Sequence, residues 1–420
     1  MLAEASKPQT LKPLEGLRVL EMGQLLAGPF ATVLLAWFGA EVIKIEPPGT
    51  GDPLRTWRSM YDGTALWWYI LGRNKKSVTL NLRHIKGQAI ARRLAERVDV
   101  VLENFRPGTL EKWGLGYADL KAINPRIIMA RVSGWGQDGP NSRKPGFASV
   151  AEGFGGLRYV TGYPDRAPVR PNLSLGDTLA GLHAALGILV AVYNRDVNAG
   201  CGQVVDVALY ESVFNMMEGV VPDFDKLGVI REREGNRLAG IVPTGTWKCK
   251  DGKYVIIGGN GDTIFKRFMN AIGRPDLASD PRLQHNNGRV ESANLIELAI
   301  EQWTSQRSLG DVISILEDAE VPVGPIHSVA DIMKDAHYEA RRMFETHMLP
   351  DGTSLKLPAI VPRLAETPGA TNWIGPELGA HNHEILCGML GIPEEELSAL
   401  AAEGVIGSRL SKATSTSKPR

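Results

Sequence analysis

The sequence predicts an α/β fold in which a parallel sheet carries helices on both faces and a smaller domain follows. The chain has 420 residues, more than one hydrophobic core usually serves, so we expect two domains. In the first half, short apolar strand patterns alternate with helical patterns, as in parallel α/β sheets. After about residue 226 this alternation gives way to a Gly-rich strand-and-turn region.

The strands and helices of the first half follow one another along the chain. An apolar run at 17–22 precedes an apolar helix at 27–38, which ends at Gly39, a residue suited to a helix C-cap. Further helices are expected at 86–98 and from Asp177 onward. The remaining strand candidates are 41–46, 77–82, 100–103 and 127–132.

The sequence of the second half predicts a small α+β domain, followed by a segment that returns to the large domain. We set the first part of the large domain at 1–225, the small domain at 226–328 and the return segment at 329–420. Within the small domain, strands and turns around 240–262 precede helices at 291–300 and 309–319. The segment 330–342 is predicted to be helical, and the last helices are expected at 383–389 and 394–403.

Composition excludes several functional classes. Lys plus Arg and Asp plus Glu each number 47, so the zero net charge argues against general binding to nucleic acid or membranes. Residues 51–150 nevertheless hold 17 basic and 8 acidic residues, a local charge of +9. Three distant cysteines fit a reducing compartment, and no signal peptide or apolar run of about 18 residues is apparent. We therefore expect a soluble cytoplasmic protein.

Common site motifs are missing from the sequence. Gly23 and Gly28 do not have the GxGxxG spacing of a dinucleotide site, and no strand is followed by GxxxxGK[ST]. There is no GxSxG nucleophile elbow. The pair His381 and His383 lies on a polar segment, so we expect no metal site.

Asp177, in the sequence LGDT, is the carboxylate of greatest interest. It can simply cap the helix that follows. Alternatively, a carboxylate at a helix N-terminus stays ionised and can attack an activated acyl group as a nucleophile. The sequence alone does not decide between a capping role and a catalytic role for Asp177.

The local positive charge also has two interpretations. It can be a solvated face or a site for a small polyanion such as a phosphorylated cofactor. Several of the basic residues follow predicted strands, where ligands bind in open α/β sheets. The set comprises Arg73, Lys75, Lys76, Arg83, Arg106, Lys112, Arg143 and Lys144.

Taken in order, the motifs resemble the class III coenzyme A transferases, the formyl-CoA transferase and carnitine CoA-transferase group of the CaiB/BaiF type. They include LEGLRVLEMGQLLAGPFAT, FGAEVIKIEPPGTGD, NKKSVTLNL, ENFRPGTLEKWGLGY, SGWGQDGP, LSLGDTLAGLHAALGIL and GQVVDVALYESV. The resemblance implies an obligate, interlocked ring homodimer with a Rossmann-like large domain built from both chain ends. It also implies acyl-CoA and small carboxylic acids, such as dicarboxylates, as substrates, with no tightly bound cofactor.

By this resemblance the catalytic aspartate is Asp177, which would form an acyl anhydride and then an aspartyl-CoA thioester. The residues that would contact CoA are Leu26, Ala27, Leu80, Arg83, Asn104, Phe105, Arg106, Lys112, Lys144 and Phe147.

The chain departs from formyl-CoA transferase at several positions. Leu26 stands in place of a glutamine, Pro47 in place of an arginine and Phe147 in place of a tyrosine, and the segment 239–245 has only two glycines. These differences disfavour a strict formyl/oxalate pairing. Two alternatives remain. One is a 2-methylacyl-CoA racemase of the same fold, which Phe147 disfavours because phenylalanine cannot move a proton. The other is a noncatalytic CoA-binding protein.

Overall fold

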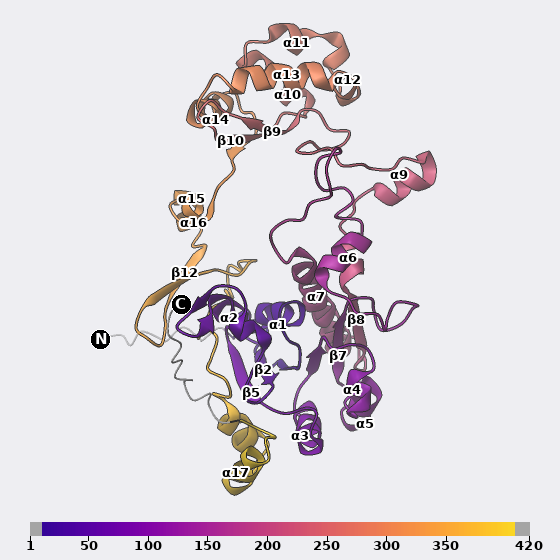
Figure 1. Cartoon of the computed structure of the whole chain (residues 1–420), viewed down its shortest axis with the longest axis vertical. Coiled ribbons are helices and arrows are strands. Elements are labelled where there is room, and N and C mark those ends of the chain that lie inside the picture. Colours follow the sequence, from indigo (N-terminus) through magenta and orange to yellow (C-terminus); the bar gives the residue numbers. More distant parts are fainter. Residues whose placement is uncertain (1–10, 408–420) are drawn as a thin grey trace, which may run out of the picture. The chain divides into compact units, whose positions relative to one another are not determined.

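A computed structural model describes residues 11–407 (Figure 1). The chain forms two compact units. The first comprises the residues up to Leu157, the segment Pro171–Met217 and the residues from Met343 on. The second comprises Arg158–Arg170 and Glu218–Arg342. The large unit is therefore built from both ends of the chain, while the limits of 225 and 328 set from sequence remain a prediction.

A six-stranded, fully parallel sheet forms the centre of the first unit. Its strand order, β5-β2-β1-β6-β7-β8, is that of a Rossmann-type sheet. The mixed α/β class expected from the alternating patterns is thus confirmed. The strands are β1 (Arg18–Glu21), β2 (Glu41–Glu46), β5 (Lys75–Thr79), β6 (Val100–Glu103), β7 (Ile128–Ser133) and β8 (Val204–Ala208).

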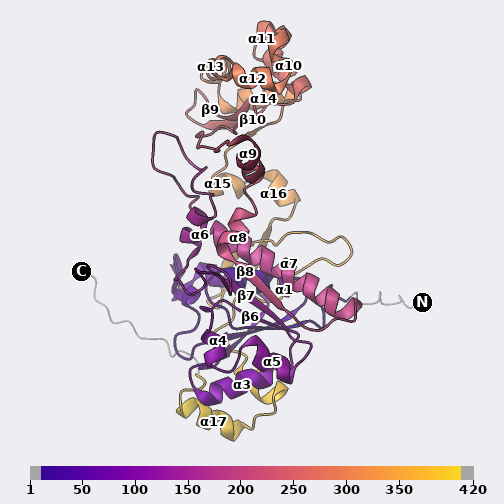
Figure 2. The same ribbon diagram turned by 90° about the vertical axis from the view of Figure 1, so that its right-hand side faces the viewer.

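Two helices cover one face of this sheet. Helices α1 (Ala27–Trp37) and α7 (Leu175–Val197) contribute small apolar side chains to a core with β1, β6 and β7 (Figure 2). The two helices approach closely at Gly181, where a Cβ atom would lie 2.7 Å from the carbonyl oxygen of Ala27. The N-terminal ends of α1 and α7 are therefore neighbours.

The other face packs on helices from both ends of the chain. Helices α3 (Ile85–Ala95) and α5 (Tyr117–Ile123) share their core with η3 (Glu384–Met389) and α17 (Glu394–Ala402), as Figure 2 shows. With both faces covered, the inner strands β2, β6 and β7 are buried almost throughout, as all-parallel sheets require.

The edge strand β5 is closed by the C-terminal segment. The Ser77 N–H donates to Nδ1 of His381 at 3.1 Å, and the His381 N–H donates to the Ser77 carbonyl at 3.0 Å. The Thr79 N–H donates to Oδ1 of Asn382 at 2.8 Å. These bonds satisfy backbone groups that an open edge would leave without partners.

Shorter elements complete the first unit. They are η1 (Pro53–Thr56), β3 (Met60–Tyr61), β4 (Thr64–Ala65), α2 (Leu66–Leu71), α4 (Thr109–Lys112), α6 (Ala148–Phe154), α8 (Leu209–Phe214), β12 (Phe344–Met348) and β13 (Ser354–Pro358).

The second unit has its own core around a three-stranded antiparallel sheet of order β11-β10-β9. Buried aromatic and aliphatic side chains of α10, α13 and α14 pack together with this sheet. Its strands are β9 (Thr244–Lys248), β10 (Tyr254–Gly258) and β11 (Val323–Pro325). Its helices are α9 (Val220–Leu227), α10 (Asp262–Ala271), α11 (Pro275–Ser279), η2 (Pro281–Leu283), α12 (Asn286–Glu291), α13 (Ala293–Thr304), α14 (Leu309–Asp318), α15 (Val329–Ile332) and α16 (Ala336–Ala340).

Helix α7 corrects one expectation. By length and composition alone it is apolar enough to cross a membrane, although we expected no apolar run of about 18 residues. The helix carries Asp177 in its first turn and Arg195 in its last, and it packs on the α/β core. Of its most apolar 18-residue stretch, 39% is buried.

Candidate active site at the carboxyl edge of the parallel sheet

The strand order reverses between β1 and β6. Strands β2 and β5 lie on one side of β1, whereas β6, β7 and β8 lie on the other. The loops that leave β1 and β6 therefore run in opposite directions from the carboxyl edge of the sheet, the place where open α/β proteins have their ligand crevice. Ligands of open α/β proteins bind at such a switch point.

Asn104, directly after β6, joins the two loops. Its side-chain nitrogen donates to the Gln24 carbonyl at 2.8 Å, and its side-chain oxygen accepts from the Gln24 N–H at 2.8 Å. Close approach is possible because β1 is followed by glycine. A Cβ on Gly23 would lie 3.1 Å from a methyl group of Leu102, and one on Gly28 would lie 2.7 Å from it. The β1–α1 loop is thus held against the end of β6.

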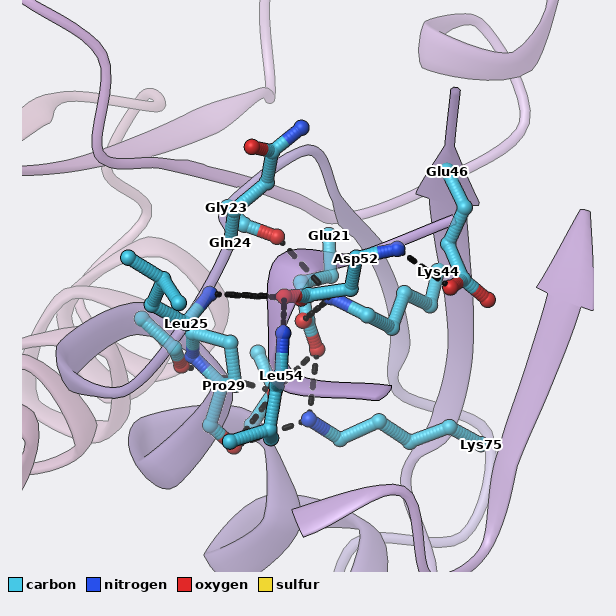
Figure 3. Close-up of polar contacts among 12 residues, drawn as sticks. Glu21, Gly23, Gln24, Leu25, Pro29, Lys44, Glu46, Asp52, Leu54 and Lys75 are labelled. Atoms are coloured by element: carbon cyan, nitrogen blue, oxygen red, sulfur yellow. Dashed lines mark hydrogen bonds and ion pairs between the residues drawn. The ribbon is translucent and has the colours of Figure 1, made fainter. Parts of the chain in front are cut away.

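A second bond holds the same loop from the other side. Leu25 has a φ of 62°, in the left-handed region that a leucine rarely adopts. Its N–H donates to Oδ1 of Asp52 at 3.0 Å (Figure 3). The Asp52 side chain is fixed in turn, because it accepts from the Leu54 N–H at 2.9 Å and caps η1. Asp52 and Asn104 together set the backbone that precedes Leu26 and Ala27.

Beneath this loop lies a buried ionic group. Glu21, at the end of β1, pairs with Lys44 at 2.6 Å and Lys75 at 2.7 Å and also accepts from the Thr32 hydroxyl (Figure 3). Lys44 pairs further with Asp52 at 2.7 Å. All four charged side chains are at most 1% exposed. Such charges are tolerated inside a protein only when they are paired and hydrogen-bonded.

The pKa values follow from this burial and pairing. Burial disfavours the Glu21 carboxylate, but the charges of Lys44 and Lys75 outweigh burial and lower the pKa of Glu21 to about 2. Burial, helped by the neighbouring Lys44, lowers the pKa of Lys75 to about 8 despite its pairing with Glu21. Burial also opposes the charge of Lys44, yet Asp52 and Glu21 raise its pKa.

A fourth buried pair extends the group toward β5. The guanidinium of Arg55 binds Glu46 at 2.7 Å, and the Ser77 hydroxyl donates to the same carboxylate at 2.6 Å. The backbone N–H of Asp52 also donates to Glu46, at 2.9 Å. Three acids and three bases thus balance one another under the crevice: Glu21, Glu46, Asp52, Lys44, Arg55 and Lys75.

Glu103 supports the loop after β6. Its carboxylate accepts from the Phe105 N–H at 2.7 Å and pairs with Arg131 at 2.8 Å. Burial raises the pKa of Glu103 to about 7, and Arg131 only partly offsets that rise. The loop that carries Asn104 and Phe105 therefore begins from an anchored backbone.

Asp177 is the third residue of α7 and is half-buried. The preceding residue, Gly176, donates its N–H to the buried Glu152 of α6 at 3.3 Å and packs against Ala148. One turn further along, Gly181 lies against Ala27. Asp177 thus lies near the starts of both α1 and α6, in the region where the β1–α1 loop leaves the sheet.

The residues predicted to contact CoA differ in accessibility. Leu26, Ala27 and Leu80 are buried. Asn104 and Phe105 are half-buried, with Phe105 packed edge-on against Trp113. Exposed side chains are presented by Arg83, Arg106, Lys112, Lys144 and Phe147. Leu26, Leu80 and Asn104 follow β1, β5 and β6, so the structure brings them to one edge of the sheet.

Three members of the basic set lie outside the crevice. Lys75 is fully buried against Glu21, and Arg73 lies 3.5 Å from Glu345 and donates to the Pro358 carbonyl. Lys76 pairs with both Glu41 and Glu384. These three cations are neutralised by acids from distant parts of the sequence, so they do not form a polyanion site. Sequence reasoning also missed Glu21, Lys44 and Asp52, since no motif marks a buried ionic group.

A cavity of about 610 Å³ lies elsewhere, at the amino end of β2 and β5. Its walls include Lys12, Glu41, Lys76 and Trp373. It is therefore on the opposite edge of the sheet from Asn104 and is separate from the candidate site. Among residues 11–407, no group of three or more His, Cys, Asp or Glu side chains is arranged to hold a metal ion.

Comparison with known proteins yields consistent matches over nearly the whole chain. A family model described as CoA-transferase family III matches residues 14–382. A succinyl-CoA–D-citramalate CoA-transferase from Chloroflexus aurantiacus is 48% identical over 94% of this chain and 98% of its own length. The alpha subunit of a succinyl-CoA–L-malate CoA-transferase from the same species is 41% identical over 94% of this chain and 92% of its own. The crystal structure of a CAIB/BAIF family protein from Brucella suis matches with a TM-score of 0.79 and 33% identity, covering 90% of this chain and 100% of that one.

Proposed function

Because this chain belongs to CoA-transferase family III, we propose that it moves CoA from an acyl-CoA to a small dicarboxylic acid. The names of two similar proteins support this substrate class, since each combines succinyl-CoA with a second dicarboxylic acid. CoA is then a substrate, and the protein itself needs no tightly bound cofactor.

The observation that carries the proposal is the position of Asp177. Its carboxylate lies in the first turn of α7, where the helix dipole favours a negative charge, and the starts of α1 and α6 surround it. A half-buried carboxylate held in this way is suited to be a nucleophile toward a thioester placed in the crevice.

The proposed reaction proceeds through two anhydrides and one thioester. Asp177 attacks the donor thioester carbonyl, the C–S bond breaks, and CoA leaves as a thiolate. The thiolate then attacks the aspartyl carbonyl and expels the donor acid, which leaves an aspartyl-CoA thioester. The acceptor carboxylate displaces the thiolate to form a second anhydride, and attack of the thiolate on the acceptor acyl carbon releases Asp177. No net proton or electron is exchanged. Covalent catalysis divides one difficult exchange into easier steps.

We assign CoA to the carboxyl edge of the sheet between β5 and β7. Five adjacent strands at about 4.8 Å spacing give this edge a length of roughly 19 Å. The exposed Arg83, Arg106, Lys112 and Lys144 are suited to phosphate groups because they are charged hydrogen-bond donors. Phe105 and Phe147, each close in sequence to one of these basic residues, are proposed to give CoA an apolar surface. The base of the proposed CoA site is formed by Leu26, Ala27, Leu80 and Asn104.

The active form is proposed to be an interlocked homodimer. Helix α7 presents an apolar row to solvent in the single chain, and a second copy of the chain is the proposed cover. The row consists of Leu182, Leu186, Leu189, Val190, Tyr193 and Val197. A relative with a separately named alpha subunit makes a mixed pair of homologous chains the alternative to test by mass measurement. We place the protein in the cytoplasm, in keeping with three cysteines that form no disulfide.

The proposal is tested by isotope exchange. The protein is incubated with succinyl-CoA and a panel of labelled small acids, and label entering the acyl-CoA pool is measured. We expect exchange with dicarboxylates, and we expect Asp177→Asn to abolish it while CoA affinity, measured by calorimetry, persists. Full turnover by the Asp177→Asn variant would exclude the aspartyl mechanism. Exchange of none of the acids by the unmodified protein would exclude the substrate class.

A further inference from the structure

The loop between η1 and α2 holds an arginine in an unusual conformation. Arg58 has a φ of 64°, in the left-handed region that residues with a side chain rarely adopt. The β3–β4 hairpin that follows is tied down where the Tyr61 hydroxyl donates to Asp351 at 2.8 Å. Such strained residues persist where the surroundings enforce them, and they concentrate at ligand sites.

Two tryptophans preorganise the Arg58 side chain. Its guanidinium carbon lies 4.4 Å from the ring centroid of Trp67. Trp67 is stacked in turn on Trp57, with centroids 6.0 Å apart and planes 8° from parallel. A guanidinium held on an aromatic face loses less conformational freedom when it binds an anion.

The same guanidinium points toward the start of the helix that carries Asp177. Nη2 of Arg58 lies 3.5 Å from Oγ of Ser174, the N-cap residue of α7. Asp177 is the third residue after Ser174 and lies in the first turn of α7. The cation therefore lies beside the start of the helix that carries the proposed nucleophile in its first turn.

Arg58 also differs from its neighbours in charge pairing. Arg55 is paired with Glu46, and Arg73 lies near Glu345. Within residues 11–407, Arg58 makes no ion pair, and its side chain is exposed. An exposed, preorganised cation without a carboxylate partner is available to a substrate carboxylate.

We propose that Arg58 is the specificity-determining residue that binds the distal carboxylate of a dicarboxylate whose other carboxyl group reacts at Asp177. The inference rests on the proposed function and adds to it the group that distinguishes diacids from monoacids. The planar guanidinium can bind the distal carboxylate with two parallel hydrogen bonds, and Ser174 supplies a hydroxyl beside it. A short diacid suits this arrangement, because both groups lie at the start of α7.

The test compares the exchange of labelled succinate into succinyl-CoA with that of labelled butyrate into butyryl-CoA. Butyrate has the same chain length but no distal carboxylate. The variants are Arg58→Ala, Arg58→Lys and the control Arg97→Ala, which removes another exposed arginine before β6, at the opposite edge of the sheet. CoA affinity is measured for each by calorimetry, and folding is checked by circular dichroism.

We expect Arg58→Ala to lower kcat/KM for succinate by roughly 10- to 100-fold, the usual loss for a hydrogen bond to a charged group. CoA affinity and any butyrate exchange should stay unchanged, Arg58→Lys should retain part of the preference, and Arg97→Ala should retain all of it. Equal loss for succinate and butyrate, weaker CoA binding, or an unchanged succinate rate would each overturn the assignment. Failure of the unmodified protein to exchange any diacid would instead refute the proposed function.

Discussion

The buried ionic group under the crevice predicts strong energetic coupling between Lys44 and Asp52. Their side chains are 2.7 Å apart and at most 1% exposed. The perturbation is a double-mutant cycle with Lys44→Met and Asp52→Asn. Asparagine keeps an acceptor for the Leu25 N–H but removes the charge, and methionine keeps the apolar stem of lysine but removes the ammonium group.

The expected magnitude follows from charge balance. Breaking a buried ion pair by removing one partner costs about 3–5 kcal/mol, because a charge is left uncompensated. Lys44 keeps Glu21 at 2.6 Å when Asp52 is replaced, so we expect the lower end, about 3 kcal/mol, for Asp52→Asn. Lys44→Met removes the cation that pairs with the buried Asp52, so we expect about 4–5 kcal/mol for that variant. In the double variant, two acids and two bases remain, so the charge balance is restored. The double variant should therefore be more stable than the sum of the single effects predicts, by about 2–3 kcal/mol.

The assay is thermal and urea unfolding of the four proteins, followed by tryptophan fluorescence. Each single variant should lose roughly 3–6 °C in Tm, because a chain of 420 residues has an unfolding entropy of about 0.9 kcal/mol/K. The matched control is a cycle on Lys86 and Glu403, an exposed pair at 2.6 Å, where the coupling should stay below about 1 kcal/mol. Single variants within 1 kcal/mol of the unmodified protein, or strictly additive effects of Lys44→Met and Asp52→Asn, would refute this reasoning.

Three further predictions concern acid stability, CoA binding and packing. The fold lowers the pKa of Glu21, so its stabilising contribution is present above about pH 4.5 and is lost as the pH falls toward about 2. The difference in unfolding free energy between the unmodified protein and Glu21→Gln should therefore shrink between these pH values. A constant difference would contradict the lowered pKa. If Arg106 binds the 3′-phosphate, Arg106→Ala should weaken CoA about tenfold or more and dephospho-CoA much less in calorimetry, whereas equal weakening would exclude that contact. Gly181→Ala should destabilise by about 1–3 kcal/mol, because its Cβ would lie 2.7 Å from the Ala27 carbonyl, whereas Gly388→Ala, with nothing within 4 Å, serves as the control in the same melts.

Local patterns were sufficient to predict most elements of the sheet unit. The apolar runs at 17–22 and 127–132 lie within one residue of β1 and β7, and the helix expected at 27–38 is α1. The strand predicted at 77–82 begins two residues earlier, because Lys75 and Lys76 belong to β5. In a sequence, two charged residues in a row indicate a loop. Here they are part of a strand because acids that are distant in the chain pair with them.

The same reason limited the prediction of the site. The alternation of EVIKIE indicates one polar face, yet β2 is buried on both faces, with Lys44 and Glu46 neutralised by Glu21, Asp52 and Arg55. The acids that pair with the basic residues of 51–150 come largely from outside that segment. Charges that are separated along the sequence are therefore brought together in the fold. Motif order led to Asp177 and Asn104. No motif marks Arg58, whose backbone conformation and aromatic stacking appear only in three dimensions.

The closure of β5 by residues near the C-terminus has a consequence for biosynthesis. Trp373, His381 and Asn382 contact the free edge of β5, and Trp68 and Arg55 each donate to the Pro376 carbonyl. A ribosome adding about 5–20 residues per second needs tens of seconds to reach them after β5 has emerged. During that interval the nascent sheet has an open edge beside incompletely packed ionic groups. Chains that stall or terminate before about residue 380 should therefore depend on chaperones and be removed by proteolysis. The sheet formed by the first half of the chain is thus complete only once the segment around residue 380 has been translated.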